Sequence, residues 1–247
     1  EYTDNDLASG TTYFYKVISA NSLFASGYSN TLEITTLGVE MPVFADISSP
    51  TNTSIALIWT HSGTTGTSLV IQRSVNPTTG FESIATLDAS ETTYTDNAVE
   101  YNTAYYYRMF ASTTIGNSDT TSVISMLAGA VIFDEISVTR CNYKLLDPGG
   151  LNNYPESYQK TMVIYPSEAG KMVSISVEQV DFGSGDGINF YDGTTTSATN
   201  LYMLYNTYAP SAPIQATNPD GALALYFYSN SGTVAPGFKL NVNCVTP

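Results

Sequence analysis

Residues 94–113 read YTDNAVEYNTAYYYRMFAST, and residues 2–21 read YTDNDLASGTTYFYKVISAN. The two stretches begin 92 residues apart, and seven of their twenty positions are identical. A period of about 90 residues is the size of one small β-sandwich. The repeat therefore predicts that the chain holds one complete module of this size and part of another.

Short alternating strands surround the second stretch. Ile55, Leu57 and Trp59 occupy every second position and therefore share one face of a strand. Further strands are predicted at residues 69–73, 81–87 and 105–110, and Asn76-Pro77 marks a turn between two of them. Since no segment combines helical periodicity with caps, the pattern predicts an all-β chain.

Two features of this region resemble the fibronectin type III family. They are Trp59 on the second strand and the turn before the penultimate strand, LASGTTY at 7–13 and VEYNTAY at 99–105. The resemblance covers about residues 1–127. It implies immunoglobulin-like sandwiches, with the C-terminal part of one domain at 1–37 and a complete domain at 38–127. It also implies that Tyr13 and Tyr105 are tyrosine-corner residues, whose hydroxyls return to the backbone.

The first copy holds only two predicted strands, near residues 11–20 and 30–36. Two strands alone cannot bury a sandwich core. Either upstream residues complete the domain, or a neighbouring molecule completes the sheet by strand addition. We favour the first interpretation, because truncation is the commoner situation.

The last third of the chain carries a different set of motifs. They are NYPESY at 153–158, VDF at 180–182, DGINFYDG at 186–193, LALYFYS at 223–229 and PGF at 236–238. Their order and spacing resemble a CUB domain. The resemblance implies a jelly-roll sandwich over residues 128–247. Strands are predicted at 161–165, 172–181, 187–192, 213–217, 222–229 and 237–243.

The two cysteines of the chain, Cys141 and Cys244, lie 103 residues apart. No cysteine or histidine lies near either one, so the ligand count excludes a zinc site. A disulfide that closes the final domain is the better interpretation, and two buried free thiols are the alternative. A disulfide would place the chain in an oxidising, extracytoplasmic compartment. Animal CUB domains usually carry two local disulfides, so this pattern looks like a bacterial variant.

Many CUB domains bind calcium through a Glu, an Asp that follows it in the sequence and a distant Asp. Carried over to this chain, the middle Asp falls on Asp186 and the distant one on Asn230, with Asp181 nearby. The Glu position falls near Gly183 or Ser184. The resemblance thus implies a calcium candidate at Asp186, Asp181 and Asn230, in which one of the three carboxylates is retained. Otherwise, Asp186 caps a turn and Asn230 lies in a loop.

The composition excludes several classes of partner and function. The chain has 8 basic and 22 acidic residues, for a net charge of -14, so it repels nucleic acids and anionic membranes. No apolar run is long enough to span a bilayer. The single histidine, His61, follows the Trp59 strand and is expected on a turn surface. We therefore predict that the chain is not an enzyme and needs no cofactor besides the candidate calcium.

These observations predict a non-catalytic segment of a bacterial secreted or cell-surface protein with several domains. Its sandwiches would act as spacers, and the CUB-like domain would bind extracellular protein or glycan, as in an adhesin. One alternative is the accessory binding tail of a secreted hydrolase. Another is a structural subunit that exchanges strands with other copies of itself. The aromatic strand at 105–107 is either a sugar-stacking surface or, by its alternation, mostly core.

Overall fold

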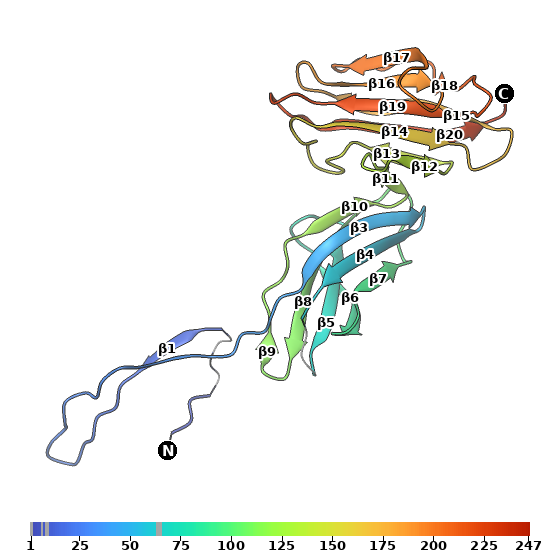
Figure 1. Cartoon of the computed structure of the whole chain (residues 1–247). Helices are drawn as coiled ribbons and strands as arrows, with labels where there is room; N and C mark the ends of the chain where they lie inside the picture. The colour runs from blue at the N-terminus through green and yellow to red at the C-terminus, as the bar shows by residue number, and fades with distance from the viewer. Residues whose placement is uncertain (1, 6, 8–9, 63–65) are drawn as a thin grey trace. The chain divides into compact units, whose positions relative to one another are not determined.

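A computed structural model describes residues 2–5, 7, 10–62 and 66–247 (Figure 1). All regular elements in these ranges are β-strands, so the all-β prediction is confirmed. Within the same ranges, no helix is long and apolar enough to cross a bilayer. Residues 8 and 9 of the predicted turn at 7–13 lie outside the described part of the chain.

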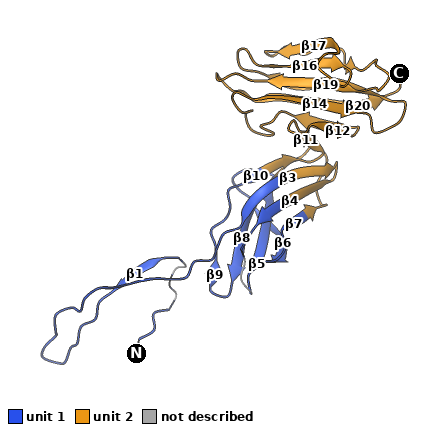
Figure 2. Cartoon of the chain, in the orientation of Figure 1, with its two compact units in different colours: residues 1–46, 58–94, 106–124 blue, residues 47–57, 95–105, 125–247 orange. Residues whose placement is uncertain are grey.

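The chain divides into two compact units, which are coloured separately in Figure 2. Unit 1 contains residues 1–46, 58–94 and 106–124, and unit 2 contains residues 47–57, 95–105 and 125–247. The predicted boundaries after residues 37 and 127 both fall between strands, since β2 ends at Thr35 and β10 ends at Leu127. They stay a prediction.

The first strands form a two-stranded antiparallel hairpin. β1 (Thr12–Tyr15) pairs with β2 (Leu32–Thr35), with Thr12 opposite Thr35. Both strands are shorter than the sequence predicts. Large apolar side chains on this hairpin and its loop are exposed, among them Phe14 at 65% and Phe24 at 76%.

The next strands form two sheets. The three-stranded sheet has the order β3 (Val43–Thr51), β4 (Ser54–Thr60), β7 (Thr93–Asp96). The second sheet has the order β10 (Ile124–Leu127), β8 (Ala104–Thr113), β5 (Ser68–Ser74), β6 (Glu82–Asp88), and β9 (Gly116–Asn117) pairs with β8.

Alternation along these strands selects the core. Ile55, Leu57 and Trp59 are almost fully buried, as their spacing predicts. Tyr105 and Tyr107 are also buried, so two of the three rings at 105–107 belong to the core. This strand therefore does not offer the sugar-stacking surface considered above.

The final domain consists of two five-stranded sheets. One has the order β11 (Ala130–Ile132), β13 (Tyr143–Leu146), β20 (Gly237–Val245), β15 (Met172–Asp181), β18 (Ile214–Gln215). The other has the order β12 (Ser137–Thr139), β14 (Gln159–Tyr165), β19 (Leu223–Tyr228), β16 (Gly187–Asp192), β17 (Thr199–Tyr205). The inner faces of both sheets meet in one core, which includes Phe190, Phe227 and Phe238.

Candidate functional site

The outer face of the β14–β19–β16–β17 sheet is rich in tyrosine. Leu223, Leu225 and Phe227 point into the core, so the alternate residues Tyr226 and Tyr228 point outward. The same alternation on neighbouring strands gives the other outward positions, which are Gln159, Thr161, Val163, Gly187, Asn189, Tyr191, Met203 and Tyr205. We call the surface formed by Tyr191, Tyr205, Tyr226, Tyr228 and Asn189 the tyrosine face.

Strand register sets the neighbours on this face. Gly187 of β16 is paired with both Tyr228 of β19 and Tyr205 of β17. In the adjacent row, Asn189 is paired with both Tyr226 and Met203. Figure 1 shows the four strands side by side. Residues from three strands thus contribute to one continuous surface.

The rings of Tyr226 and Tyr228 lie across the sheet. A Cβ on Gly187 would lie 3.0 Å from the Tyr228 hydroxyl oxygen, so the Tyr228 ring covers β16 where that strand has no side chain. Tyr226 reaches the other way, and its hydroxyl donates to Gln159 Oε1 at 3.0 Å. The two ring centroids are 5.8 Å apart and the ring planes differ by 25°. The two rings are stacked, and we call this pair the aromatic platform.

Asn189 provides a polar group within this platform. The residue is 9% exposed, and its Nδ2 donates to the Tyr191 hydroxyl at 3.4 Å. Its Oδ1 is buried and has no hydrogen-bond partner in the described part of the chain. Buried polar atoms usually have partners, so Asn189 Oδ1 is an acceptor whose hydrogen-bonding capacity is unused among the described residues.

The predicted calcium residues lie at one end of the same domain. Asp186 is 2% exposed and precedes β16, and its Oδ2 accepts a hydrogen bond from the Tyr154 hydroxyl at 2.7 Å. Its Oδ1 accepts the backbone N–H of Asn230 at 2.9 Å. The structure thus brings Asp186 and Asn230 together, whereas Asp181 is an exposed residue at the end of β15.

These contacts form a clasp between three loops rather than an open set of ligands. The Tyr154 hydroxyl also accepts the Gly183 N–H at 2.7 Å, and Asn230 Nδ2 donates to Ser184 O at 2.7 Å. Burial and the neighbouring Asp186 raise the pKa of Tyr154 to about 12, so its hydroxyl stays protonated and donates. The clasp is thus held by hydrogen bonds among its own residues.

The donor set does not fit a strong calcium site. Calcium prefers six to eight oxygens, including several carboxylates. Here one carboxylate is present and both of its oxygens accept hydrogen bonds. A side chain at Gly183 would place its Cβ 1.9 Å from Thr233 O, so this position has no room for a glutamate. The described residues contain no group of three or more acidic, histidine or cysteine side chains suited to a metal. Calcium at Asp186, Asp181 and Asn230 stays a prediction.

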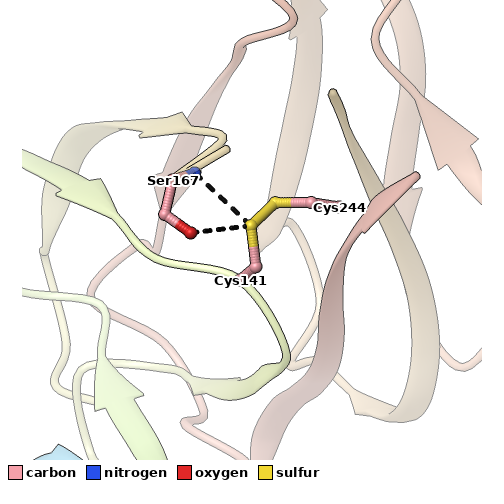
Figure 3. Close-up of a disulfide and its surroundings, with 3 residues drawn as sticks. All are labelled: Cys141, Ser167 and Cys244. Carbon is pink, nitrogen blue, oxygen red and sulfur yellow. Dashed lines mark hydrogen bonds between the residues drawn. A yellow bond between two sulfur atoms is a disulfide. The ribbon is translucent and has the colours of Figure 1, made fainter. Parts of the chain in front are cut away.

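The predicted disulfide is present in the structure (Figure 3). Tyr143 is paired with Val242 in the antiparallel β13–β20 ladder, and continuing this register by two residues places Cys141 opposite Cys244. Their Cα atoms are 5.4 Å apart, which suits a disulfide. The Ser167 backbone N–H and hydroxyl both donate to Cys141 Sγ, at 3.4 and 3.1 Å.

The two tyrosine-corner candidates and the histidine differ in their surroundings. The Tyr105 hydroxyl accepts the Glu100 N–H at 3.0 Å, five residues upstream. The residue five positions before Tyr13 is residue 8, which lies outside the described residues. His61 was expected on a turn surface. It follows β4 directly, is half-buried, and both of its ring nitrogens are shielded from solvent.

The tyrosine face was missed in the sequence, although a signal was present. Tyrosines at every second position of LALYFYS, interleaved with the core residues Leu225 and Phe227, indicate an outward-facing row. Within DGINFYDG, Asn189 likewise alternates with the core residues Ile188 and Phe190, so it also faces outward. What the sequence alone does not provide is the pairing of β16 with β19, which brings the two rows together.

No family model matches the chain, and a search of curated proteins found no match either. Solved structures do show similarity. One is an Fn3-like protein from Clostridium thermocellum, with a TM-score of 0.30 and 24% identity over 35% of this chain and 88% of that one. Another is the fibronectin type III domain of human fibronectin type III domain containing protein 3, with a TM-score of 0.30 and 22% identity over 35% and 82%.

The CUB2 domain of MASP-1, solved with bound Ca2+, is similar with a TM-score of 0.35 and 19% identity over 43% of this chain and 96% of that one. These neighbours are fibronectin type III-like proteins and a CUB domain, the two families that the sequence resembles. Because the TM-scores are low, we base the assignment of the fold on the strands and their pairing.

Proposed function

We propose that this chain is a non-catalytic segment of a bacterial secreted or cell-surface protein, in which β-sandwiches act as spacers. The C-terminal domain makes the contact with extracellular protein or glycan, as in an adhesin. The Cys141–Cys244 disulfide supports an extracellular location, because such bonds persist in oxidising compartments.

The observation that carries the spacer role is the very short connection before the C-terminal domain. β10 ends at Leu127 and β11 begins at Ala130, so Ala128 and Gly129 alone separate the two strands. Longer glycine- and serine-rich linkers behave as flexible coils and do not fix the distance between modules. A two-residue connection suits a stiff array.

Hydrogen bonds hold this connection within unit 2. Ala128 N–H donates to Thr103 O at 3.0 Å, and Asn102 N–H donates to Ala128 O at 2.9 Å. Gly129 N–H donates to Ser49 Oγ at 2.7 Å. Both residues of the connection are therefore bonded to segments 95–105 and 47–57 of the same unit.

Arg140 adds a second contact in unit 2. Its guanidinium donates to Ser49 O at 2.9 Å and to Asn52 Oδ1 at 2.6 Å. Asn52 Nδ2 in turn donates to Asn142 O at 3.1 Å. Segment 47–57 is thus bonded to both sides of Cys141 within unit 2.

Adhesion of beads under flow tests the proposal. Beads coated with the 1–247 chain should be retained on a surface of extracellular proteins or glycans, and beads coated with an unrelated acidic protein of similar charge should not. Retention on no surface would contradict the binding role. In the full protein, deletion of residues 128–247 should reduce attachment, and unchanged attachment would count against the assignment of binding to this domain.

The two alternative functions, a hydrolase tail and a strand-exchanging assembly, predict different observations. If the chain is the accessory tail of a secreted hydrolase, the same gene should encode a catalytic domain, whereas more 90-residue sandwiches favour the adhesin. The exposed apolar side chains of the β1–β2 hairpin favour a strand-exchanging assembly. Such an assembly should form concentration-dependent oligomers in sedimentation experiments.

A further inference from the structure

We propose that the tyrosine face of the C-terminal domain binds a neutral polysaccharide chain. This inference rests on the binding role proposed above and gives it a ligand class and a surface. The ring geometry, the unpaired amide oxygen and the uncharged outward positions of the described strands support it.

The aromatic platform matches the apolar side of a sugar ring. A pyranose has C–H groups on its faces and hydroxyls around its rim, so it packs flat against an aromatic ring while its rim remains free to form hydrogen bonds. The Tyr226 and Tyr228 rings are stacked with planes 25° apart, so a sugar chain that crosses this face meets both of them. Tyr205, paired with Gly187 and 52% exposed, extends the surface onto β17.

The amide groups match the sugar's hydroxyls. Asn189 Oδ1 is a buried acceptor without a partner in the described residues, and it lies in the row between Tyr226 and Met203. Gln159 Oε1 accepts from Tyr226, which leaves its amide N–H groups as donors at the edge of the platform. A hydroxyl group both donates and accepts, so it can satisfy either amide.

The lack of charge selects a neutral chain. Among the described outward positions of β14, β19, β16 and β17 given above, none is Asp, Glu, Lys or Arg. The chain as a whole has a net charge of -14, so an anionic polysaccharide or nucleic acid would be repelled without any cation here to receive it. A purely apolar partner would leave Asn189 Oδ1 unpaired, as it is in the described chain, whereas a sugar hydroxyl can donate to it.

Affinity electrophoresis of the 1–247 chain tests this inference. Native gels contain one soluble polysaccharide each: hydroxyethylcellulose, xyloglucan, galactomannan, arabinoxylan or dextran as neutral probes, and polygalacturonate or alginate as anionic ones. At least one neutral polysaccharide should retard the protein, and the anionic ones should not. Retardation by no neutral probe, or by anionic probes alone, would overturn the inference.

Variants locate the binding surface. Y226A and Y228A should each weaken binding about tenfold or more, because each removes a stacking ring. Y226F and Y228F keep the ring and should bind within about threefold of the parent chain. Y28A removes a tyrosine that is 75% exposed in unit 1, and it should leave binding unchanged. Equal binding by the parent chain, Y226A and Y228A would overturn the inference.

Asn189 gives a test that does not depend on the aromatic variants folding. Oδ1 has no partner among the described residues, and Nδ2 makes one long hydrogen bond, to the Tyr191 hydroxyl at 3.4 Å. N189A should therefore change the thermal unfolding midpoint little while it weakens polysaccharide binding severalfold. Unchanged binding by a folded N189A variant would contradict the proposed contact between Asn189 and the polysaccharide. Bead adhesion separates the two proposals: adhesion without polysaccharide binding contradicts this inference alone, and loss of both contradicts the proposed function as well.

Discussion

Tyr154 satisfies two buried groups with one hydroxyl. It donates to Asp186 Oδ2 and accepts the Gly183 N–H, both at 2.7 Å. We expect Y154F to lower the free energy of unfolding by about 1–3 kcal/mol, since it leaves a buried carboxylate oxygen and a buried N–H without this partner. Urea unfolding measures the loss. Y158F is the matched control, because the Tyr158 hydroxyl donates partly to the exposed Asp134 and water can replace it. Equal losses in both variants would contradict this account of the clasp.

The same clasp predicts that the domain does not depend on calcium. A site with a dissociation constant 100-fold below the free calcium concentration would raise the free energy of unfolding by about 2.7 kcal/mol. With the oxygens of Asp186 already bonded to Tyr154 and Asn230, we expect the thermal midpoint in 1 mM EDTA and in excess calcium to agree within about 1 °C. Magnesium is the control ion. A calcium-specific rise would instead support the ligand set implied by the CUB resemblance.

Asp147 should make stability depend on pH between about 4 and 7. The residue is 1% exposed, and burial raises its pKa to about 7, although the N–H groups of Gly149 and Phe238 donate to it. The folded state then binds a proton that the unfolded state has released. The contribution of Asp147 to the free energy of unfolding is therefore full below about pH 4. It falls as the pH rises toward 7 and stays level above that pH.

Chemical unfolding at pH 5, 6 and 7 measures this slope. The parent chain should lose on the order of 1 kcal/mol per pH unit, and D147N should be flatter whatever its absolute stability. The pKa values of Asp134, Glu178 and Asp192 are lowered, so they affect stability below this window and with the opposite sign. Parallel slopes for the parent chain and D147N would refute the assignment to Asp147.

At the scale of strands, the disulfide fixes an existing pairing. Cys141 and Cys244 extend the β13–β20 register, so the bond forms between residues that the sheet already places opposite each other. Its main effect is then on the unfolded chain, where it closes a loop of about 100 residues, worth up to about 4–5 kcal/mol. We expect the C141S/C244S variant to lose stability of that order. Urea unfolding under non-reducing conditions, with reduced parent chain as control, measures it. An unchanged midpoint would show that the unfolded state gains little freedom.

The sequence predicted long alternating strands well and short strands poorly. β15 and β16 have the predicted bounds, because period-two apolar positions and the turn at Asp192-Gly193 define them. β11 and β12 have three residues each and pair in parallel with β13 and β14, so neither alternation nor a hairpin turn marks them. β17 was also missed, since a register shift at Leu201 lets the adjacent residues Leu201 and Tyr202 both pack against the core, which breaks the alternation.

At the scale of the whole chain, the candidate site was less predictable than the fold. Family resemblance directed attention to Asp186, where the structure has a closed hydrogen-bonded clasp. The tyrosine face depends on which strands are neighbours, and residues 187–192 and 223–228 are joined by a connection that includes β17 and β18. Periodicity gives the face of each strand but not its partner, so a surface built from several strands cannot be read from the sequence alone.

The repeat also predicts how fast the backbone amides of the N-terminal hairpin exchange with solvent. In the second copy, Tyr105 and Tyr107 are buried by the facing sheet, whereas the β1–β2 hairpin leaves Phe14 65% exposed and Leu32 54% exposed. Backbone hydrogen bonds without a buried apolar face open readily, so the amides of β1 and β2 should exchange with solvent far faster than those of β15 and β20.

Hydrogen–deuterium exchange with mass spectrometry, at two protein concentrations about 50-fold apart, measures this difference. Fast exchange of residues 12–15 and 32–35 at both concentrations is the expected result, because apolar side chains of this hairpin such as Phe14 and Leu32 are exposed. Protection that appears only at the higher concentration would show that a second copy covers it, which favours the strand-exchanging assembly. Protection equal to that of β20 at both concentrations would contradict the view that this hairpin is half of an unfinished sandwich.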